Sequence, residues 1–311
     1  MVTRRVRPYA ILLVCLAMVV MAVPSALAEG TRTVKDETGR EVVIPAKPQR
    51  IVALTPWVVE MLIMLGKPPV GRPSSADWPA EALKIPEHGL SYRLNYERIA
   101  ALRPDLLIGN KDLHAPYLGN LQQVGAPVLL YMIDSYKDVI EKFKLMGELV
   151  GEPEKGAKLA GEIERRVEAV RKKVPATGHP RVLIMVGSAE AWSAAKPNSY
   201  LGDMVKLLGG VNIAETGPEH RPGYTRLSME RVVEANPDVL ILVKPVRDAS
   251  DKSKALPGFQ TDPLWNTLKA VKNGRVVELD PFLFTSPGPR YVEALEQVAA
   301  ALYPEVFRGG R

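Results

Sequence analysis

Cysteine is almost absent from this sequence of 311 residues, and its absence limits what can stabilise the fold. The single cysteine, Cys15, lies in an amino-terminal segment that we expect to be removed, so the remaining chain has no disulfide. Without a cysteine cluster, a thiolate-bound zinc or iron–sulfur centre is excluded as well. The fold must therefore depend on a hydrophobic core, which a chain of this length can form, and the usual domain size predicts two domains.

Several motifs of enzymes and nucleotide-binding proteins are also missing. The sequence contains no GxxxxGK[ST], GxGxxG, HExxH or GxSxG, the patterns that build phosphate cradles, metal sites and activated nucleophiles. We therefore predict no catalytic residues, although an exported α/β enzyme stays open as an alternative. A receptor for bare metal ions needs several converging nitrogen and carboxylate ligands. His88, His114 and His220 would supply them only if the fold happened to bring these scattered residues together.

The amino terminus contains a targeting signal. Three arginines within the first seven residues precede an apolar run at 10–23, and small residues follow up to Ala28. This order is typical of a cleavable secretory signal peptide over residues 1–28, and fourteen apolar residues are too few to span a bilayer comfortably. Cleavage near Ala28 would leave an exported, periplasmic or otherwise extracytoplasmic chain. The formal net charge would fall from +6 to +3, which gives no reason to expect nucleic-acid binding.

One segment occurs twice in the remaining chain. "NYERIAALRPDLLIG" at 95–109 and "SMERVVEANPDVLIL" at 228–242 align without a gap at an offset of 133 residues. From Glu97 and Glu230 onward, six of twelve positions are identical. The chain therefore contains an internal duplication that places a glutamate at the same position in each copy.

Each copy predicts the same local structure. Asn95 and Ser228 are good helix N-caps, because their side chains can accept from free amides of the first turn. The helix must end before Pro104 or Pro237, since proline disfavours helical geometry in the residue before it. The apolar runs that follow are typical of strands buried on both faces of a parallel sheet.

The rest of the chain extends this pattern into two similar halves. Further buried strands are expected at 50–54 and 127–133 in the first half, and at 181–186 and 274–280 in the second. Strands that alternate with helices favour parallel α/β sheets, and the duplication favours two lobes. A helix with an apolar stripe and a charged outer face is predicted between them. The expected boundaries are a first lobe at 29–152, a linking helix at 153–176 and a second lobe at 177–311.

The sequence also resembles a known family. Segments 36–66, 95–108, 208–213, 228–241 and 268–280 are similar, in this order, to the periplasmic receptors for iron complexes, haem and vitamin B12, the substrate-binding subunits of ABC importers. The resemblance implies an α/β fold of the class III periplasmic-binding-protein type, with two Rossmann-like lobes joined by a long backbone helix. It also implies a ligand cleft between the lobes, no cofactor, and as partner a permease dimer with its cytoplasmic ATPase.

The resemblance gives the duplicated glutamates a role. In such receptors, one glutamate on each lobe docks on arginines of the two permease subunits, and Glu97 and Glu230 occupy those positions. Two similar lobes that each present a carboxylate suit a two-fold symmetric partner, and arginine can bind a carboxylate through two hydrogen bonds. The alternative is that each glutamate only stabilises the dipole of its helix.

For the ligand cleft, the resemblance indicates loops at the carboxyl ends of strands. Side chains there are mainly aromatic or cationic, which suits an anionic and partly apolar iron chelate. A ferric siderophore is the first expectation, haem the second and cobalamin the third. Trp57 has the alternative of covering the core, and Arg290 that of pairing with a glutamate on a helix. The candidate cleft residues are Trp57, Tyr92, Arg93, His114, Trp192, Tyr224, Arg226, Phe284 and Arg290.

Overall fold

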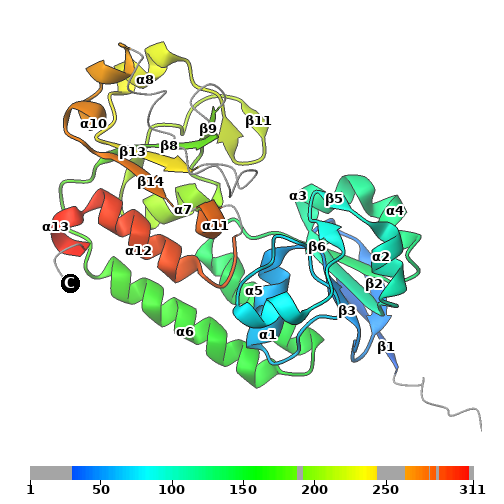
Figure 1. Ribbon diagram of the computed structural model, residues 1–311. Helices are drawn as coiled ribbons and strands as arrows, with labels where there is room; N and C mark the ends of the chain where they lie inside the picture. The colour runs from blue at the N-terminus through cyan, green and yellow to red at the C-terminus, as the bar shows by residue number, and fades with distance from the viewer. Residues whose placement is uncertain (1–29, 188–191, 244–262, 280, 285–286, 308–311) are drawn as a thin grey trace, which may run out of the picture.

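The computed structural model describes residues 30–187, 192–243, 263–279, 281–284 and 287–307. Figure 1 shows two lobes beside each other and a long helix, α6, that runs along the base from one to the other. The expected signal peptide at 1–28 lies outside the described residues. Within the part that is described, no helix has both the length and the apolar character needed to cross a membrane.

The first lobe is built on a small parallel sheet. Its strand order is β3-β6-β7, and the strands are Ile51–Ala53, Leu106–Asn110 and Val128–Tyr131. Apolar side chains are buried on both faces, because helices cover both. Its other elements are α1 (Pro56–Met64), η1 (Ala80–Lys84), β4 (Gly89–Leu90), β5 (Arg93–Leu94), α2 (Tyr96–Ala101), α3 (Lys111–His114), η2 (Ala115–Tyr117) and α4 (Leu118–Gln122).

A hairpin before the sheet protects the free edge of β7. Its strands are β1 (Thr31–Lys35) and β2 (Glu41–Pro45). In the turn between them, the Glu37 amide donates to the Leu130 carbonyl at 3.1 Å. The buried Asp36 carboxylate accepts from the Leu130 amide at 3.3 Å. These bonds satisfy edge groups of β7 that would otherwise be open to another strand.

The second lobe contains a larger, mixed sheet. Its strand order is β11-β12-β9-β8-β13-β14, with β10 paired to the start of β8. Strands β8, β13 and β14 are parallel, as the sequence predicts, whereas β9 and β12 extend the sheet in antiparallel fashion. The strands are β8 (Arg181–Gly187), β9 (Trp192–Ala195), β10 (Val211–Asn212), β11 (Glu219–Arg221), β12 (Tyr224–Thr225), β13 (Val239–Val243) and β14 (Val276–Leu279). The helical elements are α7 (Tyr200–Leu207), α8 (Met229–Ala235), η4 (Trp265–Thr267), α10 (Lys269–Lys272), α11 (Pro281–Phe284), α12 (Tyr291–Leu302) and α13 (Pro304–Phe307).

Two further helices connect the lobes: α5 (Tyr136–Leu149) and α6 (Pro153–Arg171). Helix α6 has 19 residues, a length of about 28 Å at 1.5 Å per residue. It lies within 153–176, the range in which the sequence predicts the linking helix. It packs against α5 and against α12 of the second lobe.

Glycine allows α5 and α6 to approach closely. A Cβ on Gly156 of α6 would lie 2.5 Å from the Phe143 carbonyl oxygen, and a Cβ on Gly147 of α5 would lie 2.7 Å from the Glu152 carbonyl oxygen. No side chain fits at either position, so the backbones are in direct contact.

A single hydrophobic cluster extends through both lobes and these helices. It includes Ile108 of the first sheet, Phe143 of α5, Val167 of α6, Val298 of α12 and Ile241 of the second sheet. The outer face of each sheet has a separate, smaller cluster. The lobes therefore share one core through the helices at their base.

Candidate functional site

One pair of side chains connects the two lobes electrostatically: Asp134, which follows β7, and Tyr224 of β12. Asp134 follows β7 at its carboxyl end, and its charge is close enough to Tyr224 of β12 to contribute to raising the pKa of that phenol, which burial raises most. The guanidinium of Arg221 lies over the Tyr224 ring, 3.8 Å from its centroid, as in a cation–π contact. This region therefore combines a carboxylate from one lobe with an aromatic ring and a cation from the other.

Asp134 is a titratable group in an unusual environment. Burial is the main cause that raises its pKa to about 6, and the like charges of Asp138 and Asp112 add to this effect, whereas Lys111 opposes it. Neither Asp134 nor Arg221 is among the residues predicted from the sequence. Asp134 could have been predicted as a cleft residue, because it lies directly after a predicted strand. Arg221 could not, because it lies in a short antiparallel strand that the sequence does not indicate.

Five of the predicted cleft residues remain accessible. Tyr92 is exposed in the turn between β4 and β5, and Arg93 and Arg226 are exposed as well. Trp192 and Tyr224 are half-buried, and Trp192 packs edge-on against Trp265 at 6.0 Å between ring centroids.

Two of the predicted aromatic residues lie in the core instead. Trp57 in α1 and Phe284 in α11 are each 3 % exposed and belong to the shared hydrophobic cluster. Burial of such large apolar surfaces stabilises the fold. Of the two alternatives for Trp57, the structure matches core packing. Neither side chain presents its face to a ligand.

His114 is also a structural residue and not a cleft residue. Its side chain is fully buried, and its Nδ1 accepts from the Asn110 amide at 2.9 Å. The Nε2 then carries the proton and donates to the Ser91 carbonyl oxygen at 2.9 Å. Burial lowers the pKa of this histidine. With both ring nitrogens engaged, the imidazole holds the loop around Ser91 against the end of β6.

Arg290 pairs with a glutamate across the lobes. Its guanidinium donates to both carboxylate oxygens of Glu60 in α1, at 3.1 and 3.4 Å, and lies 4.9 Å from the centre of the Trp78 ring. Glu60 is 2 % exposed, and burial is the main cause that raises its pKa to about 7, while Arg290 opposes the rise. Arg290 therefore forms an ion pair that links the second lobe to the first.

The histidines proposed for a free-metal site do not form one. His88 and His114 are both fully buried, and the His88 Nε2 lies 2.9 Å from the Ala53 carbonyl oxygen. His220 is exposed on β11 and contacts the Ser193 hydroxyl at 3.2 Å. In the described ranges, no group of three or more His, Cys, Asp or Glu side chains could hold a metal ion.

The duplicated glutamates begin two helices with the same geometry. Asn95 caps α2 by accepting from the Arg98 amide at 2.9 Å, and Ser228 caps α8 by accepting from the Arg231 amide at 3.4 Å. Both N-caps are as predicted. The glutamates that follow, at 97 and 230, are exposed, and a hydrogen bond from the Ser228 hydroxyl lowers the pKa of the second.

The carboxyl ends of α2 and α8 are held alike. Arg103 and Asn236, at equivalent positions, both adopt left-handed backbone geometry, with φ of 46° and 40°. The guanidinium of Arg50 donates to the Leu102 carbonyl at 2.5 Å, and that of Arg181 donates to the equivalent carbonyl, of Ala235, at 2.9 Å. The two helices are thus held on their lobes by similar hydrogen bonds at both ends.

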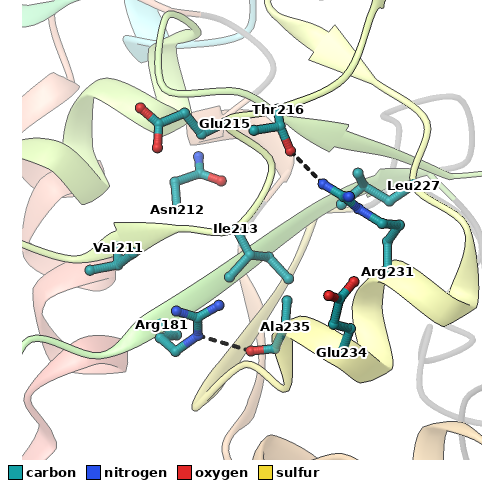
Figure 2. A pocket seen from close by; sticks show the side chains of 10 residues that line it. All are labelled: Arg181, Val211, Asn212, Ile213, Glu215, Thr216, Leu227, Arg231, Glu234 and Ala235. Carbon is teal, nitrogen blue, oxygen red and sulfur yellow. Dashed lines mark hydrogen bonds between the residues drawn. The ribbon is translucent and has the colours of Figure 1, made fainter.

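A recess lies beside each of these helices. The recess of the first lobe, about 530 Å³, is lined by β4–β5 and the first turn of α2, including Arg93, Glu97 and Arg98. The recess of the second lobe, about 390 Å³, lies between β10 and α8. Figure 2 shows the ten side chains that line the second recess, among them Arg231, whose guanidinium donates to the Thr216 hydroxyl at 2.7 Å.

Comparisons with known proteins match this architecture. A family model described as periplasmic binding protein matches residues 51–283. The chain is 25 % identical over 285 residues to an uncharacterized ABC transporter substrate-binding lipoprotein, YvrC, of Bacillus subtilis (strain 168), and the match covers 89 % of this chain and 87 % of that protein. It is 23 % identical over 260 residues to the Fe(3+)-citrate-binding protein YfmC of the same organism, with coverage of 81 % and 79 %.

A solved structure has the same fold. The crystal structure of S. aureus IsdE complexed with heme superimposes with a TM-score of 0.72 at 25 % sequence identity, and the match covers 82 % of this chain and 98 % of that chain.

Proposed function

Because this chain belongs to the periplasmic binding protein family, we propose that it serves an ABC importer by capturing an iron chelate outside the cytoplasm and delivering it to the permease. The chain is a transport binding protein and not an enzyme. The family match over residues 51–283 is the observation that carries this conclusion. Export through the signal peptide at 1–28, with cleavage near Ala28, is part of the proposal.

The proposed cargo is a ferric siderophore or a similar iron chelate, with haem as the next candidate. Of the relatives named above, YfmC is an Fe(3+)-citrate-binding protein and IsdE was solved in complex with haem. The accessible aromatic and cationic side chains among the predicted cleft residues suit such cargo, because rings can stack on its apolar parts and arginines can neutralise its negative charge. We assign this role to Tyr92, Arg93, Trp192, Tyr224 and Arg226.

Tryptophan fluorescence of the mature protein tests the cargo. The protein is titrated with ferric citrate, a ferric catecholate, haemin and cyanocobalamin. Saturable quenching by at least one iron chelate is expected, and Arg93→Ala should weaken its binding by about 1–3 kcal/mol. The control is Arg171→Ala, which removes an exposed arginine at the far end of α6. Binding of cyanocobalamin alone would replace the cargo assignment, and binding of none of the four would remove it.

For the partner, we assign permease docking to Glu97 and Glu230. Support comes from the equivalent, exposed positions of Glu97 and Glu230 in the first turns of α2 and α8, which begin with the same type of N-cap. An acidic side chain in the first turn stabilises a helix without any partner, but an aspartate would serve that role as well, so it does not require glutamate in both copies. Two equivalent carboxylates fit a permease of two similar subunits that carry arginines.

Transport by the reconstituted importer tests the docking role. Glu97→Ala combined with Glu230→Ala should leave cargo binding and melting temperature nearly unchanged but should sharply reduce uptake into liposomes, and charge reversal to Lys should reduce it further. Glu154→Ala, which removes an exposed glutamate from the first turn of α6, is the matched control. Normal uptake by the double alanine variant would contradict docking through these residues.

A further inference from the structure

The two helices that carry the docking glutamates are short and weakly packed. Helix α2 has six residues and α8 has seven, lengths at which a helix is not stable by itself in water. Each buries a single side chain, Ile99 in α2 and the equivalent Val232 in α8, whereas α5 buries six residues. The orientation of α2 and α8 on their lobes must therefore depend on hydrogen bonds as well as on packing.

The same pair of hydrogen bonds anchors the segment that follows each helix. In the first lobe, the Arg50 amide donates to the Asp105 carboxylate at 2.9 Å, and the Asp105 amide donates back to the Arg50 carbonyl at 3.0 Å. In the second lobe, the Arg181 amide donates to the Asp238 carboxylate at 2.9 Å, and the Asp238 amide donates back to the Arg181 carbonyl at 2.8 Å. Each pair of bonds joins the start of a sheet strand, β3 or β8, to the residue after the proline that follows the helix.

The side chains of the same two arginines reach the helices themselves. The Arg50 guanidinium donates to the Leu102 carbonyl, and the Arg181 guanidinium donates to the Ala235 carbonyl, the second of these bonds being drawn in Figure 2. Carbonyls at the carboxyl end of a helix lack partners within it, and a cation there also interacts favourably with the helix dipole. One arginine in each lobe thus joins a sheet strand to the carboxyl end of the helix.

The side chains on which this arrangement depends are the same in both lobes. Asp105 and Asp238 occupy equivalent positions of the duplicated segment and are identical, as are the two glutamates. Leu102 and Ala235 differ, but they contribute only a backbone carbonyl. The duplication has therefore kept the anchoring aspartate together with the glutamate that the helix presents.

We propose a positioning role in permease docking for two arginine–aspartate pairs: Arg50 with Asp105, and Arg181 with Asp238. They hold α2 and α8 in equivalent orientations, so that the glutamates at 97 and 230 meet the two permease subunits in the same geometry. A two-fold symmetric partner requires this match, because the same contact has to form twice. The inference rests on the docking role proposed above.

The chain offers matched controls for this role. Arg32 of β1 donates to the Glu148 and Leu149 carbonyls at the end of α5, both at 3.1 Å, and Arg275 donates to two carbonyls at the end of α12. These bonds have the same chemistry, but α5 and α12 bury several side chains each and carry neither glutamate.

Hydrogen exchange followed by mass spectrometry tests the anchoring without the importer. In Arg50→Ala, the amides of α2 should exchange about three- to tenfold faster, because the carboxyl end of a weakly packed helix is no longer held. Arg181→Ala should have the same effect on α8. Both arginines are exposed, so their substitution leaves the core intact. In Arg32→Ala, exchange in α5 should stay as in the parent. Unchanged exchange in both α2 and α8 would overturn the proposal.

Binding to the reconstituted importer tests the positioning role. Arg50→Ala should weaken docking about two- to tenfold with cargo affinity unchanged. It should have no further effect in the Glu97→Ala background, because a positioning residue acts only through the group that it positions. Arg32→Ala should dock like the parent. If Glu97→Ala combined with Glu230→Ala docks normally, the proposed docking role itself fails. If that double variant is impaired while Arg50→Ala docks like the parent, or weakens docking equally with and without Glu97, the docking role stands and only the positioning role is refuted.

Discussion

The buried pair of Glu60 and Arg290 makes the stability of this protein depend on pH in a way that one substitution can isolate. Glu60 lies on α1 of the first lobe, almost inaccessible to solvent, and Arg290 precedes α12 of the second. Burial penalises the charged form of a carboxyl, and the neighbouring charges of Asp77 and Glu293 add to the penalty that Arg290 only partly offsets. We predict that Glu60→Gln removes this pH dependence.

The magnitude follows from the pKa of Glu60. Its ordinary value is 4.5, and in the folded protein it is about 7. Each unit corresponds to about 1.4 kcal/mol, so the shift represents about 3 kcal/mol. Because the folded-state pKa is the higher one, folding binds a proton between these two values. The stabilising contribution of the protonated carboxyl is thus complete below pH 4.5 and is lost as pH rises through about 7.

Urea unfolding of the parent and of Glu60→Gln at several pH values from 5 to 8 measures this effect. The parent should lose stability relative to the variant as pH rises, by a total of about 3 kcal/mol. Burial also raises the pKa of Asp134 and of Asp203, but both groups are present in both proteins, so their effect cancels in the difference. A difference in unfolding free energy that stays constant from pH 5 to 8 would refute the reasoning.

Three further predictions concern the cargo region and the connecting helices. Tyr224→Ala should weaken cargo binding by about 1–3 kcal/mol, measured by the same fluorescence titration, and unchanged affinity would remove this residue from the cleft. Gly156→Ala should destabilise the protein by about 1–3 kcal/mol in urea unfolding, because the new methyl group meets the Phe143 carbonyl oxygen. On the same helix, a Cβ at Gly161 has no atom within 4 Å, so Gly161→Ala should be neutral or stabilising by up to about 1 kcal/mol. Equal losses of unfolding free energy in the two variants would refute close packing as the cause. Small-angle scattering should show nearly the same radius of gyration with and without cargo, because the long helix has no internal proline or adjacent glycines at which to bend, and shrinkage by several ångströms would contradict it.

The duplicated unit was predictable from sequence because its determinants are local. An N-cap residue, a proline that ends the helix and an apolar run each act within a few positions, and the structure confirms the caps at Asn95 and Ser228 and the strands that follow. The family resemblance gave the fold class, which the structural match confirms.

The residues that the sequence misplaced depend on distant contacts. His114 has the chemistry of a ligand, but its two partners are backbone groups that the fold brings around it. Trp57 and Phe284 stand at positions typical of a cleft, yet their surroundings place them in the core. The antiparallel strands β9, β11 and β12 are two to four residues long, too short to give a readable alternation of apolar and polar residues.

The hydrophobic cluster that extends through both lobes has a consequence for how the duplicated halves can exist. Each half has a sheet of its own, yet Phe143 and Val167 on the connecting helices pack in the same cluster as residues of both sheets. A fragment that ended between α5 and α6 would expose apolar surface on either side of the break. Because the two halves share this cluster, we expect them to melt together, in a single calorimetric transition.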